Sequence, residues 1–183
     1  MTFSIPPAYQ RMVGSLVKPA NDILASLTPE RVNLIHMAVG VCGEVAELIE
    51  GVRRGDVTNI AEETGDVIFY LVGIMQMEGY RTRVWTGVAP SQSPDIEFEL
   101  VIAAGALLDA AKKPFAYGRG IDWEAVSTEV NRISMLLVLR STLNRTTVEA
   151  AMRANQIKLF TGEKARYKDG YSDSAAEIRA DKE

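Results

Sequence analysis

Apolar side chains recur every three or four positions along most of this chain, and the alternating pattern of β-strands is scarce. This periodicity is typical of amphipathic helices, because residues three or four apart share one face of a helix. The pattern predicts an all-α protein. The expected helices cover residues 21–27, 29–53, 59–78, 95–113, 122–143 and 146–164.

Capping and helix-breaking residues set these expected bounds. Thr28 before Pro29 is typical of an N-cap followed by proline at the first helical position. A break is expected at Gly55-Asp56, and Thr58 or Asn59 is the expected N-cap of the next helix. Three further stretches are predicted to lie outside the long helices: a loop at 81–94, a turn at 114–120, and an extended or weakly helical polar tail at 168–183.

The order of the helices predicts one domain over residues 1–183, with two helical hairpins at 30–80 and 95–143. Packed face to face, they would form a four-helix-bundle-like core, followed by a C-terminal helix and tail at 146–183. The second hairpin resembles the first in a degenerate way, with Ala106 at the position of Glu44 and Arg132 at that of Asp66. We interpret this likeness as a degenerate internal duplication. Coincidental similarity between two amphipathic hairpins is the alternative.

Composition narrows the functional classes. With 183 residues, 47% of them hydrophobic and 24% charged, the chain has the composition of an ordinary globular domain. A net charge of −4 argues against a nucleic-acid polymer as partner, because such partners require a basic surface. The single cysteine, Cys42, excludes an intrachain disulfide and favours a cytoplasmic location. We expect no signal peptide and no membrane partner, because the apolar runs are shorter than the roughly 20 residues of a membrane span.

Two acidic clusters, at residues 43–50 and 62–66, interrupt the apolar helices. Helical spacing places Glu44 beside Glu47, and Glu63 beside Asp66. Two like charges about 5 Å apart repel each other by roughly 3 kcal/mol at an effective dielectric constant near 20. Either the carboxylates take up protons, or a hard divalent cation binds among them. Oxygen-only ligands suit magnesium, so the clusters predict a metal site.

Residues 36–48 and 59–71 resemble the MazG-like all-α nucleoside triphosphate pyrophosphohydrolases of phages and bacteria, which are related to the dimeric dUTPases. The shared pattern is Glu-x-x-Glu, a gap, and then Glu-x-x-Asp. Residues 155–159 and 165–172 resemble the closing motif of short members of this group, which includes Asn-x-x-Lys, and residues 179–182 have the same character.

This resemblance implies an enzyme that hydrolyses a nucleoside triphosphate to the monophosphate and pyrophosphate, with a dNTP such as dUTP or dGTP as the expected substrate. It implies Mg²⁺, with Mn²⁺ as a substitute, bound by Glu44, Glu47, Glu63 and Asp66. Glu50 is a further candidate ligand, and Glu62 is a weaker one because it points away from Glu63 on a helix. The implied substrate-binding residues are Asn155, Lys158, Arg166, Tyr167, Arg119 and His36.

Two alternatives bear on this expectation. A non-catalytic helical binding or scaffold module with a structural cation site would be expected to lose carboxylates in both hairpins, whereas the first hairpin keeps the full set. A ferritin-like di-iron bundle needs Glu-x-x-His pairs, and His36 is the only histidine in the sequence. We expect a homodimer or a dimer of dimers, because amphipathic hairpins this apolar often pair further.

Overall fold

The computed structural model describes residues 4–77 and 95–178, and within these ranges the regular structure is helical. The all-α fold class is therefore confirmed. The helices are α1 (Pro7–Leu16), α2 (Ala20–Leu24), α3 (Pro29–Arg54), α4 (Val57–Met75), α5 (Ile96–Tyr117), α6 (Trp123–Leu143), α7 (Val148–Gln156), a π-helical turn η1 (Ile157–Thr161) and α8 (Asp173–Ile178). The expected loop at 81–94 lies outside the described residues, as does the segment 179–182.

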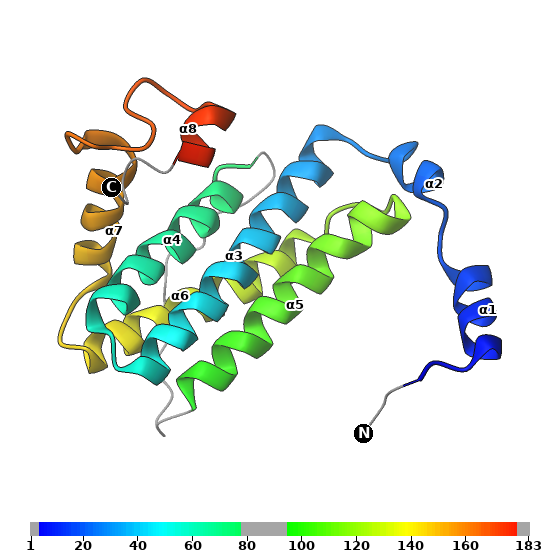
Figure 1. The fold of residues 1–183 in the computed structure, drawn as a ribbon, viewed down its shortest axis with the longest axis horizontal. Coiled ribbons are helices and arrows are strands. Elements are labelled where there is room, and N and C mark those ends of the chain that lie inside the picture. The colour runs from blue at the N-terminus through cyan, green and yellow to red at the C-terminus, as the bar shows by residue number, and fades with distance from the viewer. Residues whose placement is uncertain (1–3, 78–94, 179–183) are drawn as a thin grey trace.

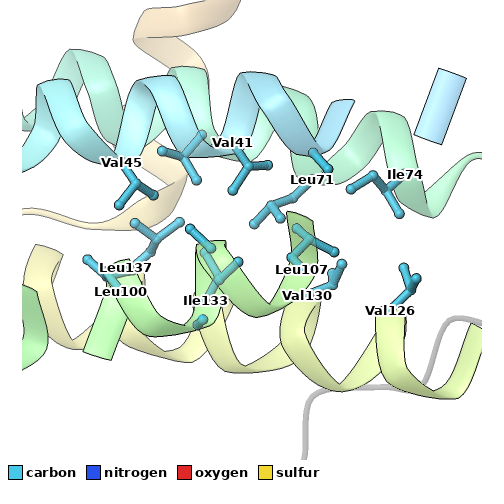
Figure 2. Close-up of a cluster of buried hydrophobic side chains, with 14 of the residues drawn as sticks. Val41, Val45, Leu71, Ile74, Leu100, Leu107, Val126, Val130, Ile133 and Leu137 are labelled. Atoms are coloured by element: carbon cyan, nitrogen blue, oxygen red, sulfur yellow. The ribbon is translucent and has the colours of Figure 1, made fainter. Parts of the chain in front are cut away.

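Helices α3 to α6 pack as two hairpins in a four-helix bundle (Figure 1). α3 lies against both α4 and α5, and α5 lies against α6. Figure 2 shows Val41 and Leu71 of the first hairpin facing Leu107 and Ile133 of the second across the core. Burying an aliphatic side chain of this size contributes about 1.5–3 kcal/mol, so this apolar interior is what holds the two hairpins together.

A tight connection joins α3 to α4. Gly55 adopts a left-handed conformation with φ 68°, which ends α3, and the side chain of Asp56 accepts a 3.0 Å hydrogen bond from the backbone N–H of Asn59. The N-cap of α4 is therefore Asp56, and the assignment of Thr58 or Asn59 as the cap was wrong by two or three positions. The break itself lies at Gly55-Asp56, as expected.

Helix α7 packs against α4, on the side away from α3 (Figure 1). A glycine makes this close approach feasible: a Cβ at Gly65 would lie 2.8 Å from the carbonyl oxygen of Ala151 and 2.9 Å from Cβ of Asn155. The helix expected to continue to residue 164 ends at Gln156 and passes into η1. The chain then turns back, and the backbone N–H of Tyr167 donates to the carbonyl of Leu159 at 2.8 Å.

Two further boundaries differ from expectation. Helix α5 continues past Pro114 to Tyr117 and is capped by Gly118, whose φ is 67°, whereas residues 114–120 were expected to form a turn. Helix α1 was not predicted. It has no buried residue and projects with α2 beyond one end of the bundle (Figure 1).

Helix α3 is long and apolar enough, by length and composition alone, to cross a membrane. Its apolar side chains instead line the bundle core, where Leu34, Val41 and Leu48 are fully buried. The side of α3 turned away from that core carries Glu47 and Glu50, both exposed. Helix α3 therefore joins an apolar core to an acidic surface.

Candidate metal and nucleotide site

A cavity of about 480 Å³ opens between α3, α4 and the segment that follows α7. This volume falls within the range of about 300–1,000 Å³ that is usual for ligand sites. Its lining combines carboxylates with aromatic and basic side chains. The lining residues are His36, Met37, Glu44, Glu47, Glu62, Glu63, Asp66, Phe69, Tyr70, Leu159, Arg166, Tyr167, Tyr171 and Ala176.

Three of the carboxylates converge. Glu44 of α3 meets Glu63 and Asp66 of α4, and each offers one oxygen such that all three oxygens lie within 4.8 Å of one another. Ligand oxygens at about 2.1–2.5 Å from one cation lie no more than roughly 5 Å apart. The spacing and the oxygen-only donor set therefore fit a hard divalent cation such as Mg²⁺ or Mn²⁺.

The pKa values of two of these carboxyl groups are raised by burial and by their close approach. Burial, the charge of Asp66 and a hydrogen bond with Glu63 raise the pKa of Glu44 to about 7. Burial also raises the pKa of Glu63, although its hydrogen bond with Glu44 acts in the opposite direction. The metal-free group thus favours uptake of a proton near neutral pH, as expected for carboxylates that lack a compensating cation.

Side-chain amides orient two of these carboxylates. Nδ2 of Asn59 donates to Oε1 of Glu63 at 2.7 Å, and Nδ2 of Asn155 donates to Oδ1 of Asp66. Such partners fix the direction in which a ligand oxygen points. The role of Asn59 was missed from the sequence, where it was considered only as a helix cap. Asn59 lies four residues before Glu63, a spacing that places both side chains on one face of a helix, and this spacing could have identified its role.

Lys158 is engaged with the acidic group. Its ammonium nitrogen pairs with Asp66 and lies 3.2 Å from Oε1 of Glu62. Burial would lower the pKa of Lys158, but the hydrogen bond and charge of Asp66 outweigh it, so the pKa is raised. Glu62, expected to point away from the cluster, instead lines the cavity and binds this lysine. Lys158 thus supplies positive charge at the edge of the acidic group.

Most other sequence-predicted residues also reach the cavity. His36, Arg166 and Tyr167 line it, and His36 and Tyr70 make an edge-on ring contact with centroids 6.4 Å apart. Glu47 lines it as well, although it is not one of the three carboxylates that converge within 4.8 Å. Among the described residues, no hydrogen bond engages the Glu47 side chain, which leaves its carboxylate available.

Two predicted residues lie outside this cavity. Glu50 is exposed on α3 and pairs with Arg54 at 3.4 Å. Arg119 follows the C-terminal end of α5, where its guanidinium lies 5.9 Å from the ring centroid of Tyr117. The described part of the chain therefore brings neither Glu50 nor Arg119 to the carboxylate group.

The second hairpin shows what its substitutions do at the corresponding positions. Arg132, which aligns with Asp66, pairs with Glu99 of α5 and lies 3.6 Å from Glu129. The guanidinium of Arg132 thus compensates the negative charges of Glu99 and Glu129. Ala106 supplies no ligand at the position of Glu44, so the second hairpin lacks the oxygen set of the first, as expected from the sequence.

Residues 34–84 match the family model of the MazG nucleotide pyrophosphohydrolase domain. This hairpin is MazG-like. The matched segment contains Glu44, Glu47, Glu63 and Asp66, so the comparison falls on the hairpin that forms the site. Curated proteins and solved structures gave no match.

MazG domains are nucleoside triphosphate pyrophosphohydrolases, which are divalent-metal-dependent hydrolases of phosphoric anhydride bonds. The protein that carries this MazG-like hairpin is accordingly an enzyme of that class, with nucleotide pyrophosphohydrolase activity in general. The site that the structure assembles has the oxygen ligands such chemistry requires. The alternative of a non-catalytic scaffold module is therefore set aside.

Proposed function

We propose that this MazG-like enzyme hydrolyses a deoxynucleoside triphosphate, such as dGTP or dUTP, to the monophosphate and pyrophosphate. The observation that carries the proposal is the convergence of Glu44, Glu63 and Asp66 within 4.8 Å on the wall of a cavity large enough for a nucleotide. These residues would hold Mg²⁺ or Mn²⁺, with Glu47 beside them.

The reaction needs one water molecule and no other reactant. Water forms a bond from its oxygen to the α or the β phosphorus, and the bond from that phosphorus to the oxygen that bridges the two breaks. Pyrophosphate is the leaving group of attack at the α phosphorus, and the monophosphate is the leaving group of attack at the β phosphorus. Either point of attack yields the same two products. A bound divalent cation supplies charge neutralisation on the phosphate oxygens and a lower pKa for water.

The protein's own groups then have separate tasks. Glu47 lines the cavity without a hydrogen-bond partner among the described residues, so we assign it the proton that the attacking water loses. Asn59 and Asn155 hold two of the carboxylates in fixed directions, which reduces reorganisation during the reaction. Arg166 lines the cavity and is suited to a bidentate contact with phosphate oxygens.

The apolar outer surface of the bundle supports a proposal about assembly. Val39 on α3, and Phe98 and Val101 on α5, are 53–60% exposed on two helices that pack together. Burying such side chains against a second copy would be favourable. We propose a homodimer or a dimer of dimers, located in the cytoplasm.

Product analysis tests the proposed function. A panel of ribo- and deoxynucleoside triphosphates is incubated with the full chain and Mg²⁺ or Mn²⁺, and the products are separated by chromatography. We expect monophosphate and pyrophosphate, with activity lost on chelation and in Asp66→Asn. Glu50→Gln, at an acidic position of α3 outside the cavity, is the matched control and should keep the activity. Release of the nucleoside diphosphate with orthophosphate, or no turnover of any nucleotide by folded protein, would contradict the proposal.

A further inference from the structure

The cavity that holds the carboxylates also has an aromatic wall. Phe69 and Tyr70 contribute to it from α4, and Tyr167 and Tyr171 from the segment after η1. Burial is the main cause that raises the pKa of Tyr70, so its phenol stays neutral. A nucleotide whose phosphates lie on the carboxylates must place its base elsewhere, and the aromatic wall is the part of the lining suited to a flat, apolar ring system.

The backbone holds the C-terminal part of this wall in place. The N–H of Arg166 donates to the carbonyl of Lys158 at 3.1 Å, in register with the bond from Tyr167 to Leu159. Gly170, with φ 97°, turns the chain in a conformation that side-chain-bearing residues rarely adopt. This turn brings the ring of Tyr171 to 5.5 Å from that of Tyr167, with 35° between their planes.

A hydrogen bond fixes the outer ring. The hydroxyl of Tyr171 donates to Oδ1 of Asp173 at 2.9 Å, although the residue is 75% exposed. A large aromatic side chain this exposed at the rim of a cavity is available for a ligand. Beside it, the Arg166 guanidinium lies 5.9 Å from the ring centroid of Tyr167. Together these residues place three planar groups close to one another beside the cavity.

We infer that residues 165–177 form a nucleobase subsite in which the base stacks on Tyr167 and Tyr171. This inference rests on the proposed function. Among the described lining residues none is Asn, Gln, Ser or Thr, so side chains that read base edges by amide or aliphatic hydroxyl groups are lacking. The aromatic side chains of this wall offer stacking area instead, and stacking favours the larger purine rings over pyrimidines and differs little between adenine and guanine.

Binding measurements test the inference without turnover. The α,β-imido analogues of dGTP and dUTP, which resist cleavage at the bridging position, are titrated calorimetrically into the full chain with Mg²⁺. Wild type should bind the guanine analogue more tightly than the uracil analogue. Tyr171→Ala should weaken binding of the guanine analogue by about tenfold. Tyr171→Phe, which keeps the ring, should restore it.

Two comparisons separate base stacking from other effects. Inorganic tripolyphosphate, which has no base, should bind Tyr171→Ala and wild type equally. Tyr9→Ala removes a tyrosine that is 57% exposed on α1, outside the cavity, and should bind the guanine analogue as wild type does. Circular dichroism confirms that each variant is folded.

The outcomes also separate this inference from the function on which it rests. Nucleotide cleavage by wild type, with unchanged affinity of Tyr171→Ala for the guanine analogue, would overturn the base subsite and leave the proposed function standing. Equal weakening by Ala and Phe would also overturn it, since the hydroxyl rather than the ring would then matter. Failure of wild type to bind or cleave any nucleotide would overturn both.

Discussion

Replacing Glu44 by glutamine should stabilise the metal-free protein at neutral and alkaline pH. In the folded, metal-free chain this carboxyl keeps its proton up to about pH 7, because burial and the charge of Asp66 raise its pKa. In the unfolded chain it loses the proton near 4.5, the ordinary pKa of a glutamate. The folded state therefore binds more protons between these values, and the unfolding free energy falls as the pH rises from about 4.5 to 7.

The size of this effect follows from the shift. One pKa unit corresponds to about 1.36 kcal/mol, so a shift from 4.5 to about 7 sets an upper bound near 3.4 kcal/mol. Glu44 is only partly buried, and solvent screening reduces the effect to about 1–2 kcal/mol. A glutamine has the same shape without the charge. Glu44→Gln should thus match wild type near pH 4.5 and exceed its stability by about 1–2 kcal/mol at pH 8.

Urea denaturation followed by far-ultraviolet circular dichroism measures this difference in a chelator at several pH values. Subtracting the variant from wild type cancels the titration of groups elsewhere in the chain. Glu50→Gln, at an exposed position on the same helix, should leave the pH dependence unchanged. Adding Mg²⁺ should reverse the order at pH 8, because binding to the folded state stabilises wild type and not the variant.

Two results would refute the reasoning. The first is a stability difference between metal-free wild type and the variant that stays the same from pH 5 to pH 8, which would mean that Glu44 carries no raised pKa. The second is a Glu44→Gln variant that is less stable than wild type at pH 8 in chelator. The carboxylate would then contribute favourable contacts as an anion, and no crowding of negative charge would exist at this site.

Four other variants should respond in predictable ways. Gly65→Ala should lower the unfolding free energy by about 1–3 kcal/mol, because its Cβ would meet α7, whereas Gly105→Ala has open space and should gain up to about 1 kcal/mol; urea denaturation separates them. Lys158→Gln removes the ammonium that pairs with Asp66, so Mn²⁺ should bind on the order of tenfold more tightly by calorimetry; unchanged affinity would contradict this. Asn59→Ala should weaken Mn²⁺ binding by about 10–100-fold, and an unaltered affinity would show that its hydrogen bond does not orient a ligand.

The fold was largely predictable because helix formation and burial follow the same periodicity. Positions such as Val41, Val45 and Leu48 repeat at helical spacing and are buried in the core. The ends of helices were less predictable. Pro114 favoured an earlier end for α5, yet the helix continues for one turn, and the end of α7 depends on backbone contacts with residues that come later in the chain.

In the site too, contacts between residues close in the sequence were predictable, and contacts between distant residues were not. Spacing of three residues was enough to pair Glu63 with Asp66 on one face of α4. The position of Glu62 could not be predicted in this way, because it depends on Lys158, 96 residues away. No local pattern indicates such a partner. Asn155 and Lys158 were named from the sequence as substrate-binding residues, and the structure places both on Asp66. Asn59, which orients Glu63, was missed.

Hydrolysis in ¹⁸O-labelled water is the most direct test of the central claim, that the carboxylate group of the first hairpin supports metal-dependent pyrophosphohydrolysis. Products of dGTP cleavage are analysed by mass spectrometry for wild type and Asp66→Asn, with Mg²⁺ and with chelator. We expect one labelled oxygen, carried by dGMP or by pyrophosphate, only in wild type with metal. Labelled orthophosphate with dGDP, or equal labelling in Asp66→Asn, would contradict it.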